Sequence, residues 1–127
     1  MQDQHLFEYA VIRIVPRVER EEFLNAGVIL FCPKQKYLKT IIHLNEQRVK
    51  AFCEETDIAA LKENLQSFVR ICDGGKTSGP IGQFDMASRF RWLTAMRSTV
   101  VQTSRVHPGF CKDAGEMMER LMGQLVK

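Results

Sequence analysis

The chain has 127 residues, of which 45% are hydrophobic, 26% charged and 9% aromatic, and its formal net charge is +3. These values are typical of a folded globular protein and exclude a disordered, collagen-like or disulfide-scaffold chain. The length predicts a single domain over residues 1–127. No apolar stretch approaches the roughly 18 to 20 residues that span a bilayer, and the first residues lack the basic start and apolar run of a signal peptide. The four cysteines include no Cys-x-x-Cys pair, so we expect a cytoplasmic protein with reduced thiols and no membrane contact.

The first third of the chain predicts three strands. Residues 6–15 are rich in aliphatic and aromatic side chains and stop before Pro16, a pattern typical of a central strand that is apolar on both faces. A polar connection follows. Residues 26–32 and 37–44 are then predicted to form a β-hairpin around the turn at 33–36.

After Asn45 the apolar spacing becomes helical. Asn45 is a plausible cap for a short helix that contains Val49 and Phe52. A longer amphipathic helix is expected to begin at Thr56 or Asp57 and to end before Gly74. Its apolar positions lie at intervals of three and four residues: Ile58, Leu61, Leu65, Phe68, Val69 and Cys72.

The remainder of the chain predicts a loop at 73–82, a helix at 85–93, a β-branched strand at 98–103 and a closing helix at 113–126. Asp113 and Glu116 stand in the positions of a capping box for this last helix. The order of elements indicates an α+β fold, with a mainly antiparallel sheet of about four strands and helices packed on one face.

The main anomaly lies between Met86 and Cys111, where there are four arginines and one histidine but no aspartate or glutamate. These residues are Arg89, Arg91, Arg97, Arg105 and His107. Because a guanidinium group stays charged near pH 7 and presents a fork of donors, the window predicts an anionic partner. That partner could be a phosphate-bearing ligand or an acidic surface of another protein. The alternative is that acids from elsewhere in the chain, such as Asp3, Glu8 or the cluster at 19–22, neutralise the arginines internally.

An enzyme that acts on a phosphorylated or nucleotide substrate is the second interpretation. Ser98, His107 or Cys111 would then be the reactive group, but a Cys-His pair needs a turn that folds the two together, and no third orienting residue is evident. The scattered histidines give no metal-ligand spacing, and no phosphate-loop motif is present. We therefore expect no metal, no cofactor and, on balance, no catalysis.

Nucleic-acid binding is the third interpretation. Phe90 and Trp92 could stack on bases, but a net charge of +3 is modest for a dedicated binder, and no zinc-finger or RNA-recognition signature is present. Three methionines on the last helix indicate either core packing or an adaptable interface, which would include one between copies of the chain.

Two stretches carry a family resemblance. Residues 9–16 and 20–33 resemble the amino-terminal pattern of a bacterial family catalogued as domain of unknown function 3037, and residues 90–102 and 107–109 resemble its carboxy-terminal pattern. Met96 stands where we expect proline in many relatives. The resemblance implies a small bacterial cytoplasmic protein, often encoded near a kinase similar to the persistence-toxin kinases, and hence an accessory or regulator of such a kinase. The residues at matching motif positions are Arg13, Asn25, Arg91, Arg97, Ser98 and His107.

The leading hypothesis is a noncatalytic binding or regulatory protein. We expect the region around Arg91, Arg97, Arg105 and His107 to hold an anionic group on a ligand or a partner protein. Asn25, and Arg97 together with Ser98, would add polar groups at the ends of strands, where sites often form, and Arg13 is included as a residue that matches the family motif. On this hypothesis Arg97→Ala weakens binding and barely changes the melting temperature.

Overall fold

A computed structural model describes residues 4–97 and 99–127. In this part of the chain, three strands are followed by four α-helices, two further strands and a closing α-helix, with single 3₁₀ turns at Val18–Arg20 and Pro33–Gln35. The strands are β1 (His5–Ile14), β2 (Leu24–Cys32), β3 (Tyr37–Ile42), β4 (Val101–Thr103) and β5 (His107–Cys111). The helices are α1 (Glu46–Phe52), α2 (Ile58–Asp73), α3 (Gly79–Gly82), α4 (Met86–Leu93) and α5 (Ala114–Leu125).

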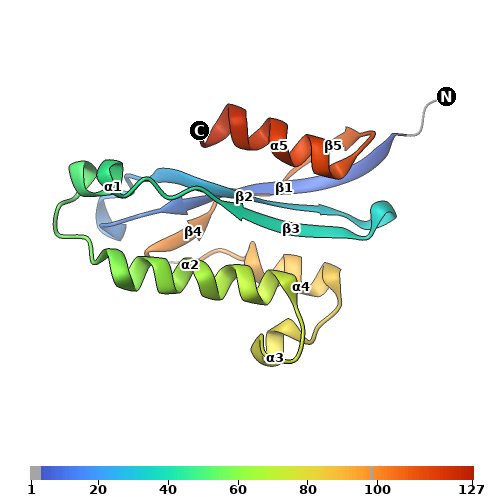
Figure 1. Ribbon diagram of the computed structural model, residues 1–127, viewed down its shortest axis with the longest axis horizontal. Coiled ribbons are helices and arrows are strands. Elements are labelled where there is room, and N and C mark those ends of the chain that lie inside the picture. The colour runs from blue at the N-terminus through green and yellow to red at the C-terminus, as the bar shows by residue number, and fades with distance from the viewer. Residues whose placement is uncertain (1–3, 98) are drawn as a thin grey trace.

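The strands form one antiparallel sheet in the order β3-β2-β1-β4, and β5 also pairs with β1 (Figure 1). The long β1 makes this possible, because it pairs with β5 along its first half and with β4 along its second half. The α+β class, the antiparallel sheet and the hairpin of β2 and β3 are confirmed. The sheet has five strands in place of about four.

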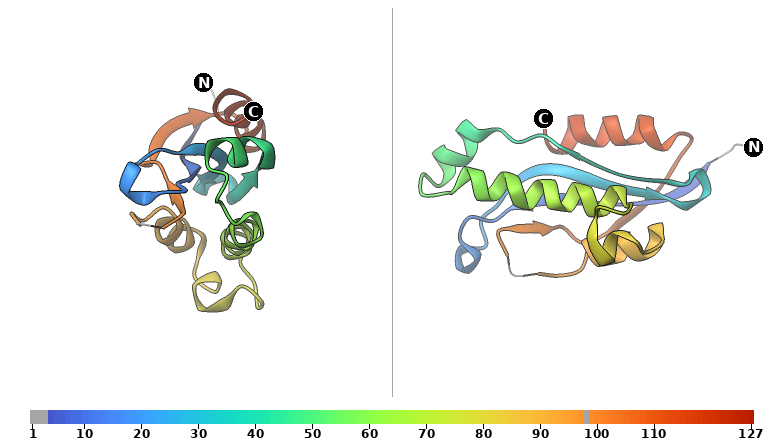
Figure 2. Two further views of the ribbon diagram at one scale, coloured as in Figure 1. Left: turned by 90° about the vertical axis from the view of Figure 1, so that its left-hand side faces the viewer. Right: turned by 60° about the horizontal axis from the view of Figure 1, so that its bottom comes forward.

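The helices cover both faces of the sheet, which corrects the expectation that they pack on one. α2 and α4 lie on one face and α5 lies on the other (Figure 2). The cause is in the two central strands, whose alternate residues are buried in two separate clusters. Ile12 and Ile29 belong to the cluster under α2 and α4, and Val28 and Leu30 belong to the cluster under α5. Strands that are apolar on both faces need a helix layer on each.

Four helices begin at a side-chain cap, in each case through an N–H three residues further on. Arg48 N donates to Asn45 Oδ1 over 3.0 Å and Ala60 N donates to Asp57 Oδ1 over 3.1 Å. Equivalent bonds of 2.7 and 2.9 Å join Asp85 to Ser88 N and Asp113 to Glu116 N. These bonds satisfy N–H groups that have no partner within the helix, so the helix starts predicted from Asn45, Asp57 and Asp113 are confirmed.

The segment after α4 departs from the prediction. The strand expected over 98–103 is observed as Val101–Thr103, and Ser98 lies outside the described residues. The turn-rich residues around Pro108 and Gly109 form β5, a strand at the edge of the sheet. Proline is tolerated there because an edge strand has one side without ladder partners.

No helix in the described residues is both long and apolar enough to cross a membrane.

Candidate functional site

Two arginines of the acid-free window are held by backbone carbonyls at the ends of helices. Arg89 Nε donates to Cys72 O over 3.3 Å, at the end of α2, and its Nη1 donates to Phe84 O over 2.6 Å. Arg97 donates to the carbonyls of Leu93 and Trp92, which are the last two residues of α4. Carbonyls at a helix C-terminus lack intrahelical donors and carry partial negative charge, so both guanidinium groups stabilise helix ends.

Arg97 also lies against an aromatic ring. Its guanidinium carbon is 4.2 Å from the centroid of the Trp92 ring, and partial burial lowers the pKa of Arg97. This geometry ties Arg97 to the stability of α4, whereas on the hypothesis of a binding role its removal leaves the melting temperature nearly unchanged.

Arg91 forms an ion pair with an acid on the neighbouring strand. Arg91 Nη2 is 2.9 Å from Glu8 Oε1, and Nη1 is 3.2 Å from Glu8 Oε2. The arginine side chain remains 59% exposed while the glutamate is 26% exposed. The two-point contact fixes the plane of the guanidinium group and leaves much of it open to solvent.

Arg105 and His107 lie at the edge of the sheet that β5 forms. Arg105 is exposed in the connection between β4 and β5. His107 is opposite Tyr9 in the pairing of β5 with β1, and the two rings are tilted by 34° with centroids 5.3 Å apart. The histidine therefore packs against an aromatic neighbour on the strand next to it.

The structure does not assemble the Cys-His pair considered above. His107 and Cys111 are four positions apart on one strand, which separates them by about 13 Å. Cys111 is 4% exposed, and burial raises the pKa of its thiol to about 11. A thiol in that environment is protonated near pH 7 and is a poor nucleophile.

An exposed apolar pair lies beside the ion pair of Arg91. Leu6 and Phe110 are opposite each other on β1 and β5, and they are 48% and 64% exposed. Since Leu6 and Glu8 are two residues apart on one strand, they share a face of the sheet with Phe110. We call the patch formed by Leu6, Glu8, Arg91, Pro108 and Phe110 the β1–β5 edge surface. The residues of this surface could be recognised in the sequence as one patch only once β5 was known to be a strand.

Arg13 and Asn25 form a separate cluster on the opposite face, at a β-bulge. They are opposite each other across β1 and β2, where the register shifts between Ile12 and Arg13. The Arg13 guanidinium carbon is 4.0 Å from the Phe23 ring centroid, and Asn25 Nδ2 donates to Leu125 O over 3.0 Å. Arg13 Nε and Asn25 Oδ1 are buried without a hydrogen-bond partner among the described residues.

The site residues suggested by the sequence thus fall into distinct places. Arg91 lies on α4 and Arg97 binds the carbonyls at its end, while Asn25 binds the last residue of α5 and Arg13 is opposite Asn25 on β1. His107 and Arg105 are on and beside the β5 edge, and Ser98 is not among the described residues. No group of three or more His, Cys, Asp or Glu side chains in the part of the chain that the structure describes could hold a metal ion.

The fold and this surface define an antiparallel α+β protein with a helix layer on each face and an apolar and charged patch at one sheet edge. The chain belongs to the family described as protein of unknown function DUF3037, whose model matches residues 9–126. The resemblance inferred from residues 9–16, 20–33, 90–102 and 107–109 is thereby confirmed. No curated protein and no solved structure matches the chain.

Proposed function

We propose that this protein is a noncatalytic binding or regulatory protein that docks a partner protein through the β1–β5 edge surface. The observation that carries the proposal is the exposed cross-strand pair of Leu6 and Phe110 next to the oriented guanidinium group of Arg91. Aromatic and arginine side chains contribute most of the binding energy in many protein interfaces, particularly where apolar contacts exclude water from a charged group.

The charge of this surface favours a partner with an anionic group. Glu8 binds one side of the Arg91 fork, and the exposed remainder can donate to a carboxylate or a phosphate on the partner. Arg105 adds a second exposed cation in the connection that leads into β5. A partner with an apolar patch flanked by an acidic or phosphorylated side chain would match both features.

The partner class that the family resemblance suggests is a kinase-like protein encoded nearby. A small accessory protein would then regulate this kinase by binding it. The docking chemistry supports such binding: an apolar pair of side chains, a pre-oriented arginine and a sheet edge.

The test titrates the purified protein with the purified kinase-like protein from the adjacent gene. Calorimetry measures the affinity, and size-exclusion chromatography detects the complex. Phe110→Ala and Arg91→Ala should each weaken binding by roughly tenfold or more, as expected for residues that cost over about 1.4 kcal/mol when truncated. Phe84→Ala is the matched control, because Phe84 is also an exposed aromatic residue, at 45%, but lies in the loop before α4. Equal affinity of Phe110→Ala and the unmodified protein would refute the assignment of the surface.

A thermal-shift series with inorganic phosphate and nucleotides separates this proposal from binding of a small anionic ligand. Stabilisation by a nucleotide that disappears in Arg91→Ala would make the ligand, and not a partner protein, the function of this surface.

A further inference from the structure

The opposite edge of the sheet carries a second surface with different features. β3 pairs with β2 and is an edge strand in the described part of the chain. His43 N donates to Ala26 O over 2.7 Å, and bonded and non-bonded pairs alternate along an antiparallel ladder. The N–H and C=O groups of Leu38, Thr40 and Ile42 therefore point away from β2, toward the open edge.

A groove runs beside this open edge, between β3 and α2. It has a volume of about 560 Å³, and Figures 1 and 2 show α2 running alongside β3 at this side of the molecule. Its apolar lining consists of Ile42, Leu44, Leu65 and Val69. An unpaired strand edge next to an apolar groove is the arrangement by which folded domains bind an extended peptide as an added strand.

The charges around the groove favour a peptide with acidic residues. Arg70 lines the groove and is exposed. Lys62 is also in the lining, but its charge is balanced by Glu46 at 2.6 Å. Lys39 is exposed in the middle of β3, on the face opposite to the groove because its neighbours Leu38 and Thr40 alternate with it. The face of an incoming strand that points away from the groove therefore meets Lys39, while Arg70 lies on the groove side.

We propose that β3 and α2 form a binding site for an extended segment of a partner protein that alternates apolar and acidic residues. The segment extends the sheet by pairing with the backbone of Leu38, Thr40 and Ile42. Its apolar side chains fill the groove, and its carboxylates, which alternate with them, project to the opposite face and bind Lys39. This site is independent of the β1–β5 edge surface, which lies at the other side of the sheet.

A second copy of the chain is the competing occupant of an open edge. Two β3 strands paired about a twofold axis would bring Lys39 of each copy into the same region, and like charges on facing strands are destabilising. A central lysine is one of the features that keep edge strands from pairing with their own copies. The acidic peptide removes this repulsion and is for that reason the occupant we infer.

The test uses the complete ¹⁵N-labelled chain and synthetic eight-residue peptides that alternate Val, Ile or Phe with Glu. In the free protein, the edge-facing amides of Leu38, Thr40 and Ile42 should exchange their hydrogens rapidly. A bound peptide should slow these three amides by about tenfold or more, since each then donates to the added strand. A peptide methylated at its alternate backbone nitrogens should not bind, because it has lost the donors that pairing requires.

Charge variants test the side-chain part of the proposal. Lys39→Glu should raise the dissociation constant of the peptide by about five- to tenfold, from the loss of one ion pair and its replacement by repulsion. Arg120→Glu makes the same charge change on the exposed side of α5 and should alter it by less than about twofold. Phe110→Ala should bind the peptide normally, which separates this site from the proposed partner surface.

Three results would overturn the inference. One is the absence of protection with every peptide at millimolar concentration. Another is protection confined to β5. The third is protection of β3 that depends on protein concentration without peptide and coincides with a dimer in sedimentation, because the edge would then belong to a second copy.

Discussion

The cysteine side chains differ in chemical environment although none is bonded to another. The Thr56 hydroxyl, the Glu55 backbone and the Arg17 guanidinium lie around Cys53 and hold the pKa of its thiol below the ordinary value. Burial instead raises the pKa values of Cys72 and Cys111 to about 11. Because the thiolate is the reactive form, these environments rank the thiols by reactivity.

We predict that iodoacetamide at pH 7 to 8 alkylates Cys53 well before Cys72 or Cys111 in the folded protein. The rate for Cys53 should rise with pH around a midpoint below the ordinary pKa of a free thiol. Peptide mapping by mass spectrometry measures each site. Arg17→Ala should move the midpoint of Cys53 upward, while Arg20→Ala, a nearby arginine that pairs with Glu22, should leave it in place. Alkylation of Cys72 or Cys111 at the rate of Cys53 in folded protein would contradict the ranking.

Arg97 is predicted to act mainly on stability. Arg97→Ala removes a cation from the carbonyl end of α4 and from the face of Trp92, and each contact contributes about 0.5 to 1 kcal/mol. The melting temperature, measured by circular dichroism, should fall by roughly 3 to 10 °C. Arg105→Ala, at an exposed position in a connection, should change stability by less than about 0.5 kcal/mol. Equal melting temperatures for the two variants would show that the contacts of Arg97 contribute nothing.

The hairpin of β2 and β3 depends on a close backbone approach at one glycine. A Cβ atom at Gly27 would lie 2.4 Å from Ile41 O and 3.3 Å from the Cα atom of Ile42 on the facing strand. Gly123 in α5 has no atom within 4 Å of the equivalent position.

We therefore predict opposite effects of the same substitution in two elements. Gly27→Ala should destabilise the protein by about 1 to 3 kcal/mol, because backbone atoms must move apart. Gly123→Ala should stabilise it by about 0.4 to 1 kcal/mol, since alanine restricts the unfolded chain and suits a helix. Urea denaturation of both variants measures the difference. Destabilisation by Gly123→Ala would mean that other atoms of the protein pack against the exposed side of α5 at this position.

Elements with local signals could be predicted from the sequence, and those that depend on distant partners could not. The caps at Asn45, Asp57 and Asp113 act within three residues of themselves, so their residue types suffice to place the helix starts. β5 was missed because Pro108 and Gly109 are typical of turns, and only pairing with β1 makes this segment a strand.

The same limit applied to the candidate site. The acid-free window predicted an anionic partner or neutralisation by acids elsewhere in the chain, but it could not single out Glu8 as the acid that pairs with Arg91, because the two residues are 83 positions apart. Arg89 and Arg97 bind carbonyls, which every residue has and no sequence pattern displays. The apolar pair of Leu6 and Phe110 could be recognised only after both strands were aligned.

At the scale of the whole molecule, one sheet serves two cores. Ile29 is buried against α2 and α4, and its neighbour Leu30 is buried against α5. Each layer of helices therefore holds in place the strands on which the other layer packs. Loss of packing on one face should weaken the entire domain, because small domains generally unfold as a single cooperative unit.

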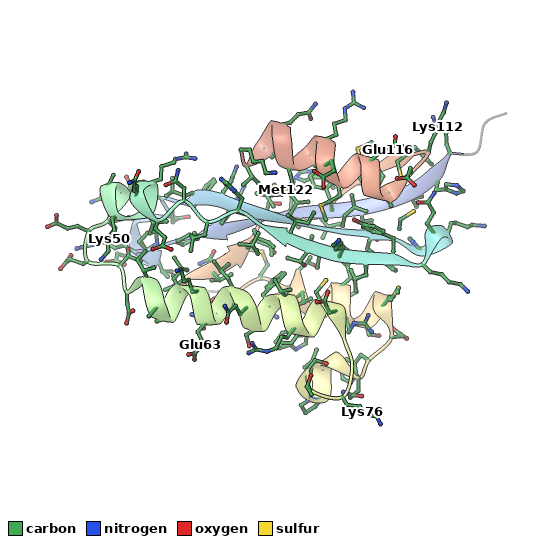
Figure 3. The ribbon with its side chains drawn as sticks, viewed as in Figure 1. Lys50, Glu63, Lys76, Lys112, Glu116 and Met122 are labelled. Atoms are coloured by element: carbon green, nitrogen blue, oxygen red, sulfur yellow. The ribbon has the colours of Figure 1, made fainter. Side chains whose placement is uncertain are left out.

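Met122 provides the test of this coupling. It lies on the side of α5 that faces the sheet and is 1% exposed (Figure 3). Met122→Ala should destabilise the protein by about 2 to 5 kcal/mol through lost contacts and a cavity.

Trp92 is on α4, across the sheet from this cavity. Its fluorescence transition in urea should nevertheless move together with the far-ultraviolet circular dichroism. Met96→Ala, at a side chain that is 91% exposed, should leave both transitions unchanged. A shift in circular dichroism with an unmoved Trp92 transition would show that the two faces unfold separately and that α5 is an independent unit.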